Sequence, residues 1–148
     1  MLKIPNTTVW LGNASDLRDI PGMLNNGVTA IVDLAIEEPL PRIPRTTNYC
    51  RFTLTDDGEN NPATIRAAVL SASAFIDGGH VTAVCCNAGL NRSPSIAAAA
   101  LSYLSADTPA QSLEYVATVK NIDVNPALWT QIVGVLSDME TGTAHRAS

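Results

Sequence analysis

The chain has 148 residues, 46% of them hydrophobic and 16% charged, which suffices for one domain with a buried core. The net charge is −5 and no cluster of lysine or arginine occurs, so nucleic acid and membrane surfaces are not expected as partners. No apolar run approaches the ~20 residues of a membrane span, and residues 1–5 do not open a signal peptide.

The first part of the chain predicts two strands separated by a helical stretch. Residues 7–12 form a short apolar run typical of a strand. Residues 13–24 indicate a helix, with Ser15 as the N-cap candidate and a break or restart at Pro21. Residues 28–34 are apolar almost throughout, which favours a strand in a sheet covered on both faces.

A proline-rich loop and a third strand lead into a long helix. Residues 37–45 carry three prolines and predict a connector, with a place beside a ligand site as the alternative. Residues 49–54 alternate like a strand, and an acidic turn follows at residues 55–60. Residues 61–77 predict a helix that starts on Asn-Pro. Its apolar stripe has helical spacing and consists of Ile65, Val69, Ala72 and Ile76.

The second half of the chain contains one more strand and three helices. Residues 81–85 predict a buried strand, and the alanine-rich run at residues 96–101 predicts a buried helix. Residues 108–120 begin with a capping box, and residues 125–136 form an apolar helical pattern. A polar tail follows, assigned to residues 141–148.

The order of these elements predicts the fold class. Strands alternate with helices and several helices then follow in a row, which is typical of an α/β protein. We expect a single domain over residues 1–140 with a central, mostly parallel sheet flanked by helices. Ligands of such sheets bind at the carboxyl ends of the strands, which is where residues 86–92 lie.

The polar loop between the strand at 81–85 and the alanine-rich helix has the composition of an oxyanion site. Backbone N–H groups gathered above a helix N-terminus bind doubly charged anions. Gly89 provides a position without side-chain sterics, and the planar guanidinium of Arg92 can hold two phosphate oxygens. The same positive field favours a thiolate at Cys86. A thiolate facing a bound phosphate can attack phosphorus and form a phosphocysteine.

The sequence from Cys86 to Arg92 and Ser93 resembles the signature loop of the cysteine-based protein tyrosine phosphatases, Cys-x5-Arg-Ser/Thr. The resemblance runs over most of the chain and is strongest to the small (atypical) dual-specificity phosphatases. It implies that Ser93 assists departure of the cysteine thiolate. It also implies that the phosphate is held by Arg92 and by the loop residues Asn87, Ala88, Gly89, Leu90 and Asn91.

The resemblance also implies a general acid just after the strand that precedes the long helix. Asp56 occupies that place, and Asp57 is the alternative. A carboxylic acid there would protonate the departing oxygen and then act as base for water. An acidic turn held by aspartate side chains is the structural explanation for one of the two.

Cys85 marks a departure from the family, which usually has histidine immediately before the nucleophile. We consider two roles for Cys85, a small buried residue and a thiol that forms a disulfide with oxidised Cys86. With Cys50 the chain has three cysteines, which suggest no disulfide framework and suit a reducing cytoplasm. Histidines and cysteines at these spacings predict no metal site, and no cofactor is expected.

The predicted function is a metal-independent phosphomonoester hydrolase of the protein tyrosine or dual-specificity type. Its expected substrates are phosphorylated proteins and small aryl phosphates, because the loop interior at residues 87–91 lacks the basic residues that favour more highly charged substrates. A catalytically weak or inactive phosphate-binding module of the same fold is the main alternative, and sulfur or arsenate chemistry is a third. Nothing in the sequence indicates an obligate oligomer, so we expect a monomer.

Overall fold

A computed structural model describes residues 1–147, with the side chains of residues 143–147 excepted. The strands are β1 (Leu2–Lys3), β2 (Val9–Gly12), β3 (Ala30–Asp33), β4 (Asn48–Arg51) and β5 (Thr82–Cys85). The helices are α1 (Ala14–Leu17), α2 (Ile20–Asn25), α3 (Pro62–Asp77), α4 (Arg92–Tyr103), α5 (Pro109–Val119) and α6 (Pro126–Ala147).

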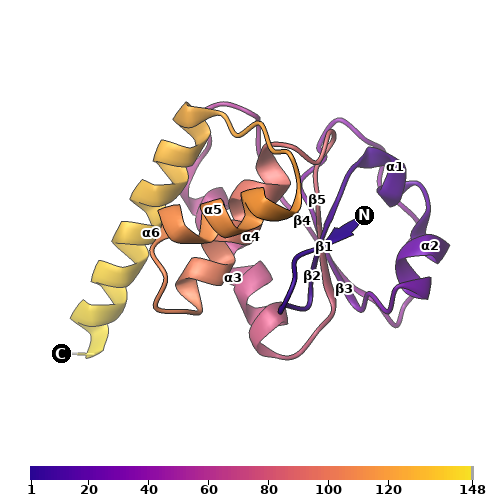
Figure 1. Ribbon diagram of the computed structural model, residues 1–148, viewed down its shortest axis with the longest axis horizontal. Coiled ribbons are helices and arrows are strands. Elements are labelled where there is room, and N and C mark those ends of the chain that lie inside the picture. The colour runs from indigo at the N-terminus through magenta and orange to yellow at the C-terminus, as the bar shows by residue number, and fades with distance from the viewer. Residues whose placement is uncertain (148) are drawn as a thin grey trace.

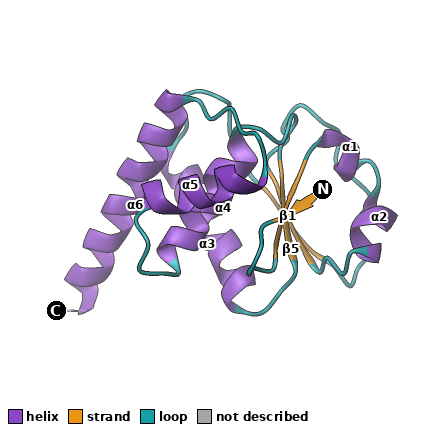
Figure 2. Ribbon diagram, in the orientation of Figure 1, coloured by secondary structure: helices purple, strands orange, loops and turns teal. Residues whose placement is uncertain are grey.

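A 5-stranded sheet in the order β1-β2-β5-β3-β4 forms the middle of the molecule. β1 runs antiparallel to β2, and the remaining neighbours are parallel. Seen edge-on, the sheet separates α1 and α2 on one side from α3, α4, α5 and α6 on the other (Figure 1, Figure 2). The predicted single α/β domain with a mostly parallel sheet is therefore confirmed.

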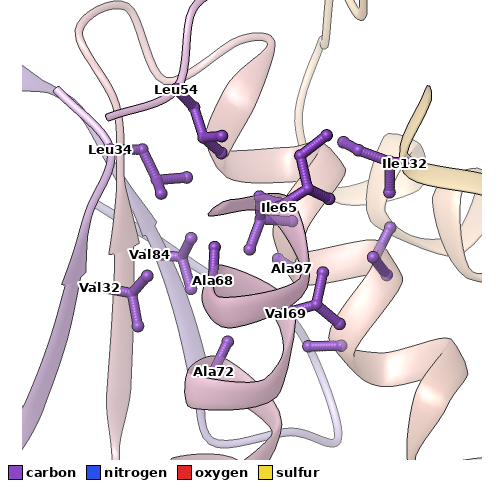
Figure 3. Packing of buried hydrophobic residues seen from close by; sticks show 14 of the residues in the cluster. Val32, Leu34, Leu54, Ile65, Ala68, Val69, Ala72, Val84, Ala97 and Ile132 are labelled. Carbon is purple, nitrogen blue, oxygen red and sulfur yellow. The ribbon is translucent and has the colours of Figure 1, made fainter. Parts of the chain in front are cut away.

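The alternation of side chains along β5 divides the core in two. Val84 faces the larger cluster, where it meets Val32 of β3 and Ala68 of α3 (Figure 3). Ala83 and Cys85 belong to a second cluster beneath α1 and α2. Because successive residues of a strand point to opposite faces, Cys86 returns to the larger cluster. The period of the strand thus places the two neighbouring cysteines on opposite sides of the sheet.

Three local expectations differ from the structure. The N-cap of the first helix is Asn13 rather than Ser15, because the side chains of Asn13 and Asp16 each accept a hydrogen bond from the other's backbone N–H. A short antiparallel edge strand, β1, was not predicted, since two residues give no readable alternation. The polar residues expected as a frayed tail after about Met139 continue α6 as far as Ala147. Ser148 lies outside the described residues.

Other helix boundaries agree with the sequence. Pro21 lies at the second position of α2, which restarts after α1 with Asp19 as its N-cap. α3 begins with the Asn61 cap and ends at Gly78, and α5 begins with the predicted capping box of Thr108 and Gln111. Within residues 1–147, none of the helices combines the length and the apolar character needed to cross a bilayer.

Ile132 tests the contribution of α6 to the core. Its side chain is fully buried in the larger cluster, which includes residues of α3 and α4. We expect Ile132→Ala to lower the free energy of unfolding by about 2–5 kcal/mol, because the truncation leaves a cavity. Urea unfolding measures this change. The control Thr130→Ala alters an exposed position of the same helix and should shift stability by no more than about 0.5 kcal/mol. Equal losses of stability in Ile132→Ala and Thr130→Ala would contradict the burial of Ile132 in the core.

Candidate active site

The loop that joins β5 to α4 lies at the carboxyl end of the central parallel strands. Beside it is a cavity of about 430 Å³. Three segments line the cavity: this loop, the turn before α3, and the connection between α5 and α6 with the first residue of α6. The lining residues are Asp56, Cys86, Asn87, Ala88, Leu90, Asn91, Asp123, Val124, Asn125 and Pro126. A further cavity, on the α1 and α2 side, is lined by none of the predicted site residues.

Hydrogen bonds from outside the loop fix the direction of its peptides. The carbonyl of Asn87 accepts from the backbone N–H of Ala14, and that of Leu90 accepts from the backbone N–H of Asp123, both at 2.9 Å. In a trans peptide the following N–H points the opposite way, so the N–H groups of Ala88 and Asn91, two residues of the cavity lining, point away from the backbone donors of Ala14 and Asp123. This is the arrangement of a backbone nest for an anion.

Cys86 lies at the base of this nest. Its side chain is 1% exposed. Its Sγ accepts a hydrogen bond from the N–H of Gly89 at 3.2 Å and lies 3.3 Å from Oγ of Ser93. Gly89 has φ +73, a left-handed conformation that favours glycine. The sulfur is thus within hydrogen-bond distance of two groups that can stabilise a thiolate.

Arg92 is buried, with 2% of its surface exposed. Its Nη1 donates to the carbonyls of Leu34 at 2.7 Å and Leu54 at 3.1 Å. Its two terminal nitrogens also donate to the two carboxylate oxygens of Glu37, each at 2.7 Å. The guanidinium is therefore fixed by residues that follow β3 and β4.

Glu37 is a site residue that the sequence reasoning missed. The loop at residues 37–45 was predicted as a connector, with a place beside a ligand site as the alternative, and the structure supports the alternative at Glu37, which accepts hydrogen bonds from the terminal nitrogens of Arg92. Hydrogen bonding to Arg92 lowers the pKa of the Glu37 carboxyl. A signal was available, because residues that follow neighbouring parallel strands meet at one edge of the sheet, and β3 neighbours β5.

Asp56 lies beside the remaining edge of Arg92. Its Oδ1 is 2.9 Å from Nε of Arg92 and accepts from the side-chain amide of Asn91 at 3.1 Å. The Nε–H of Arg92 is not aligned with that oxygen and is left without a hydrogen-bond partner. A buried donor without a hydrogen bond is costly, and Asp56, the residue nearest to this donor, lines the cavity.

Asp57 serves the turn instead. Its Oδ1 accepts from the backbone N–H of Glu59 and from the hydroxyl of Thr55, both at 2.9 Å. Both bonds lower the pKa of the Asp57 carboxyl, and the bond from the Glu59 N–H has the larger effect. The structure therefore brings Asp56 to Arg92 and leaves Asp57 in the role of an Asx turn.

Cys85 lies on the other side of the sheet from Cys86. It is fully buried in the cluster beneath α1 and α2, and burial raises the pKa of its thiol well above the usual value. A side chain at Gly12 would place its Cβ only 2.7 Å from Sγ of Cys85, so glycine leaves the room for this sulfur. These observations favour the role of a small buried residue over that of a redox partner for Cys86.

Ser93 is fully buried at the start of α4, where its hydroxyl meets the sulfur of Cys86. The predicted loop residues Asn87, Ala88, Leu90 and Asn91 all line the cavity. Within the described part of the chain, no set of three histidine, cysteine, aspartate or glutamate side chains is placed to hold a metal ion.

Comparisons with known proteins agree with this geometry. No family model matches the chain, and no curated protein matches its sequence. Human DUSP28 superposes with a TM-score of 0.83 at 19% identity, covering 96% of this chain and 99% of that one. A mouse putative dual-specificity phosphatase complexed with zinc tungstate gives 0.82 at 18% identity, covering 96% of this chain and 89% of the other. The chain has the fold of the small dual-specificity phosphatases.

A third solved structure of the same fold is a phosphatase-like interacting protein. The human tyrosine phosphatase-like serine/threonine/tyrosine-interacting protein superposes with a TM-score of 0.77 at 18% identity, covering 97% of each chain. The dual-specificity phosphatase fold predicted from residues 86–93 is therefore confirmed, and it accounts for the position of the loop between the central strand and α4.

Peroxide treatment tests the placement of the two cysteines. We expect mild oxidation to modify Cys86 and to leave Cys85 as a free thiol, because Cys85 is buried on the opposite face of the sheet. Differential alkylation followed by mass spectrometry distinguishes the two residues. The Cys86→Ser variant is the control, and its peptide should stay unmodified. A disulfide between Cys85 and Cys86 would contradict the arrangement.

The ion pair between Glu37 and Arg92 predicts a pH dependence of stability. The lowered pKa of Glu37 means that the pair contributes fully above the ordinary glutamate value of about 4.3. That contribution is lost as the pH falls through the lowered value. Urea unfolding should show that the free energy of unfolding of the wild type exceeds that of Glu37→Gln most at neutral pH, and that this difference shrinks in acid. Glu140→Gln, at an exposed position of α6, is the control. A difference that persists or grows in acid would argue against the pair.

Proposed function

We propose that this protein hydrolyses phosphomonoesters by way of a phosphocysteine on Cys86, as a phosphatase of the protein tyrosine or dual-specificity type. One observation carries the proposal. The sulfur of Cys86, a residue of the cavity lining, accepts the N–H of Gly89, and the Nε–H of Arg92, which makes no hydrogen bond, lies 2.9 Å from Oδ1 of Asp56, another residue of the same lining. The nest and the arginine together suit a phosphate dianion.

The first step is attack of the Cys86 thiolate on phosphorus. A P–S bond forms as the ester P–O bond breaks, and the departing oxygen takes a proton from the carboxylic acid of Asp56. Asp56 lies against Arg92 in this structure, and phosphate binding at Nε would displace it.

The second step returns the enzyme to its starting state. A water molecule attacks phosphorus, its proton passes to the Asp56 carboxylate, and the P–S bond breaks. The thiolate that leaves is met by the hydroxyl of Ser93 and the N–H of Gly89. Hydrogen bonds to a developing anion from donors already in place are an effective source of catalysis.

The substrate class follows from the cavity. Apart from the acidic Asp56 and Asp123, its lining is neutral, with no lysine or arginine side chain among the ten residues. A single phosphate on an aryl or alkyl group fits this environment better than a polyphosphate, because extra negative charges would have no local partner. We propose phosphotyrosine proteins and small aryl phosphates as substrates, with phosphoserine and phosphothreonine as further candidates. The mouse relative complexed with zinc tungstate supports oxyanion binding, and a reducing cytoplasm would keep Cys86 reduced.

A phosphate-binding module without efficient catalysis is the second candidate. It is favoured by the engagement of Arg92 with two carboxylates, those of Glu37 and Asp56, and by the absence of the histidine that usually precedes the nucleophile. The similarity to a phosphatase-like interacting protein is compatible with it. Both candidates require phosphate binding, and only the first requires turnover.

Hydrolysis of p-nitrophenyl phosphate distinguishes the two candidates. We expect activity that survives a chelator, disappears in Cys86→Ser, and falls by about 10²–10⁴-fold in Asp56→Asn because the leaving oxygen loses its acid. Asp57→Asn is the matched control and should retain most activity, since Asp57 bonds only within its turn.

The outcomes separate clearly. A larger loss in Asp57→Asn than in Asp56→Asn would transfer the acid role by one residue. A wild type that binds phosphate but shows no turnover would establish the binding module instead.

A further inference from the structure

Lys120 is the only positively charged side chain that donates a hydrogen bond to the backbone of the phosphate loop among the described residues. It follows the last turn of α5 in an extended conformation. Its Nζ donates to the carbonyl of Gly89 at 2.9 Å, and its side chain is half-buried. No motif or spacing connects it with Cys86, which lies 34 positions earlier along the chain.

The bond from Lys120 acts on one peptide of the loop. The carbonyl of Gly89 belongs to the same peptide as the N–H of Leu90, and the two groups point in opposite directions. With the carbonyl held by the ammonium, the N–H of Leu90 points away from Lys120, and Leu90 is one of the residues that line the cavity. The positive charge of the Lys120 ammonium beside the carbonyl oxygen also polarises this peptide and makes its N–H a stronger donor.

The space around Gly89 is shaped to admit the ammonium. A Cβ at Gly89 would lie 2.8 Å from Nζ of Lys120 and 3.0 Å from the carbonyl oxygen of Gly12. The glycine therefore permits a left-handed backbone with φ +73 and leaves room for the lysine at the same time. Its N–H donates to Sγ of Cys86, so the two ends of this one residue connect the ammonium to the nucleophile.

Two further bonds come from the same connection between α5 and α6. The backbone N–H of Asp123 donates to the carbonyl of Leu90 at 2.9 Å, and that of Asn125 donates to Oδ1 of Asn91 at 2.8 Å. Both are backbone donors, which substitutions at those positions would retain. Lys120 is the one member of this set whose contribution depends on its side chain.

We propose that Lys120 is a positioning residue of the phosphate loop, which directs the N–H of Leu90 into the anion site and adds a positive charge behind it. This deepens the proposed function, since it concerns how the same loop binds a phosphate. Lys120 bonds to the outer side of the loop, so it is not itself a catalytic residue.

Affinity for inorganic phosphate is the direct test, because it does not require turnover. Isothermal titration of the wild type, Lys120→Met, Lys120→Gln and Lys120→Arg gives the dissociation constants. We expect binding to weaken by about tenfold in Lys120→Met, which loses a hydrogen bond from a charged donor. Lys120→Gln should lie between, and Lys120→Arg should stay nearest to the wild type because it keeps both charge and donor.

The chain provides a matched control. Lys3 is the only other lysine, and it is exposed on the edge strand β1. Lys3→Met removes the same charge and should leave phosphate affinity unchanged. Thermal melting is recorded for each variant, since a purely structural lysine would lower the melting temperature without changing phosphate affinity in the folded protein.

Each result bears on the proposal. Phosphate affinity in Lys120→Met equal to the wild type would overturn it. If Lys120→Met does not fold, Lys120→Gln and Lys120→Arg decide, and equal affinity in Gln, Arg and wild type would overturn the part played by the charge. A wild type that binds phosphate without hydrolysing p-nitrophenyl phosphate would remove the proposed activity and leave the role of Lys120 intact. A wild type that does not bind phosphate would overturn both.

Discussion

The fixed position of the Arg92 guanidinium is the constraint on which the rest of the site depends. A buried charge is unfavourable unless it is paired and hydrogen-bonded. Here the carbonyls of Leu34 and Leu54 and the carboxylate of Glu37 supply the partners. These residues follow β3 and β4, so the arginine at the start of α4 connects loops from two neighbouring strands. The Nε–H of Arg92 makes no hydrogen bond, although Oδ1 of Asp56 lies 2.9 Å from Nε.

The loop itself is held open by bonds on its outer side. Its carbonyls accept donors from the start of α1 and from the connection between α5 and α6. An isolated loop with several N–H groups converging on one point would have no internal reason to keep that shape, because parallel peptide dipoles repel one another. The surrounding elements provide that reason, and the proposed binding of a phosphate would depend on this preorganisation.

Alternation along β5 gives neighbouring cysteines separate environments. Cys86 faces the cavity, whereas Cys85 fills space beneath α1 and α2 where the glycine at position 12 allows it. Cys85, where the related phosphatases usually have histidine, packs in that second cluster with the carboxylates of Asp16 and Asp33 near its thiol. This position therefore lies on the face of the sheet opposite to Cys86.

The sequence by itself determined the fold class, the order of most elements and the place of the loop from Cys86 to Arg92 between a strand and a helix. Hydrophobic period, caps and the spacing from Cys86 to Arg92 are local properties that the chain states directly. Other features depended on the tertiary structure. The contact of Asp56 with Arg92, the pairing of Glu37 with Arg92, the separation of Cys85 from Cys86 and the reach of Lys120 to Gly89 all involve residues distant in sequence or the faces of a sheet. Only the packing of the folded chain brings such groups within a few ångströms of one another. Hydrophobic periodicity and residue spacing do not predict distances between residues that are far apart in the sequence.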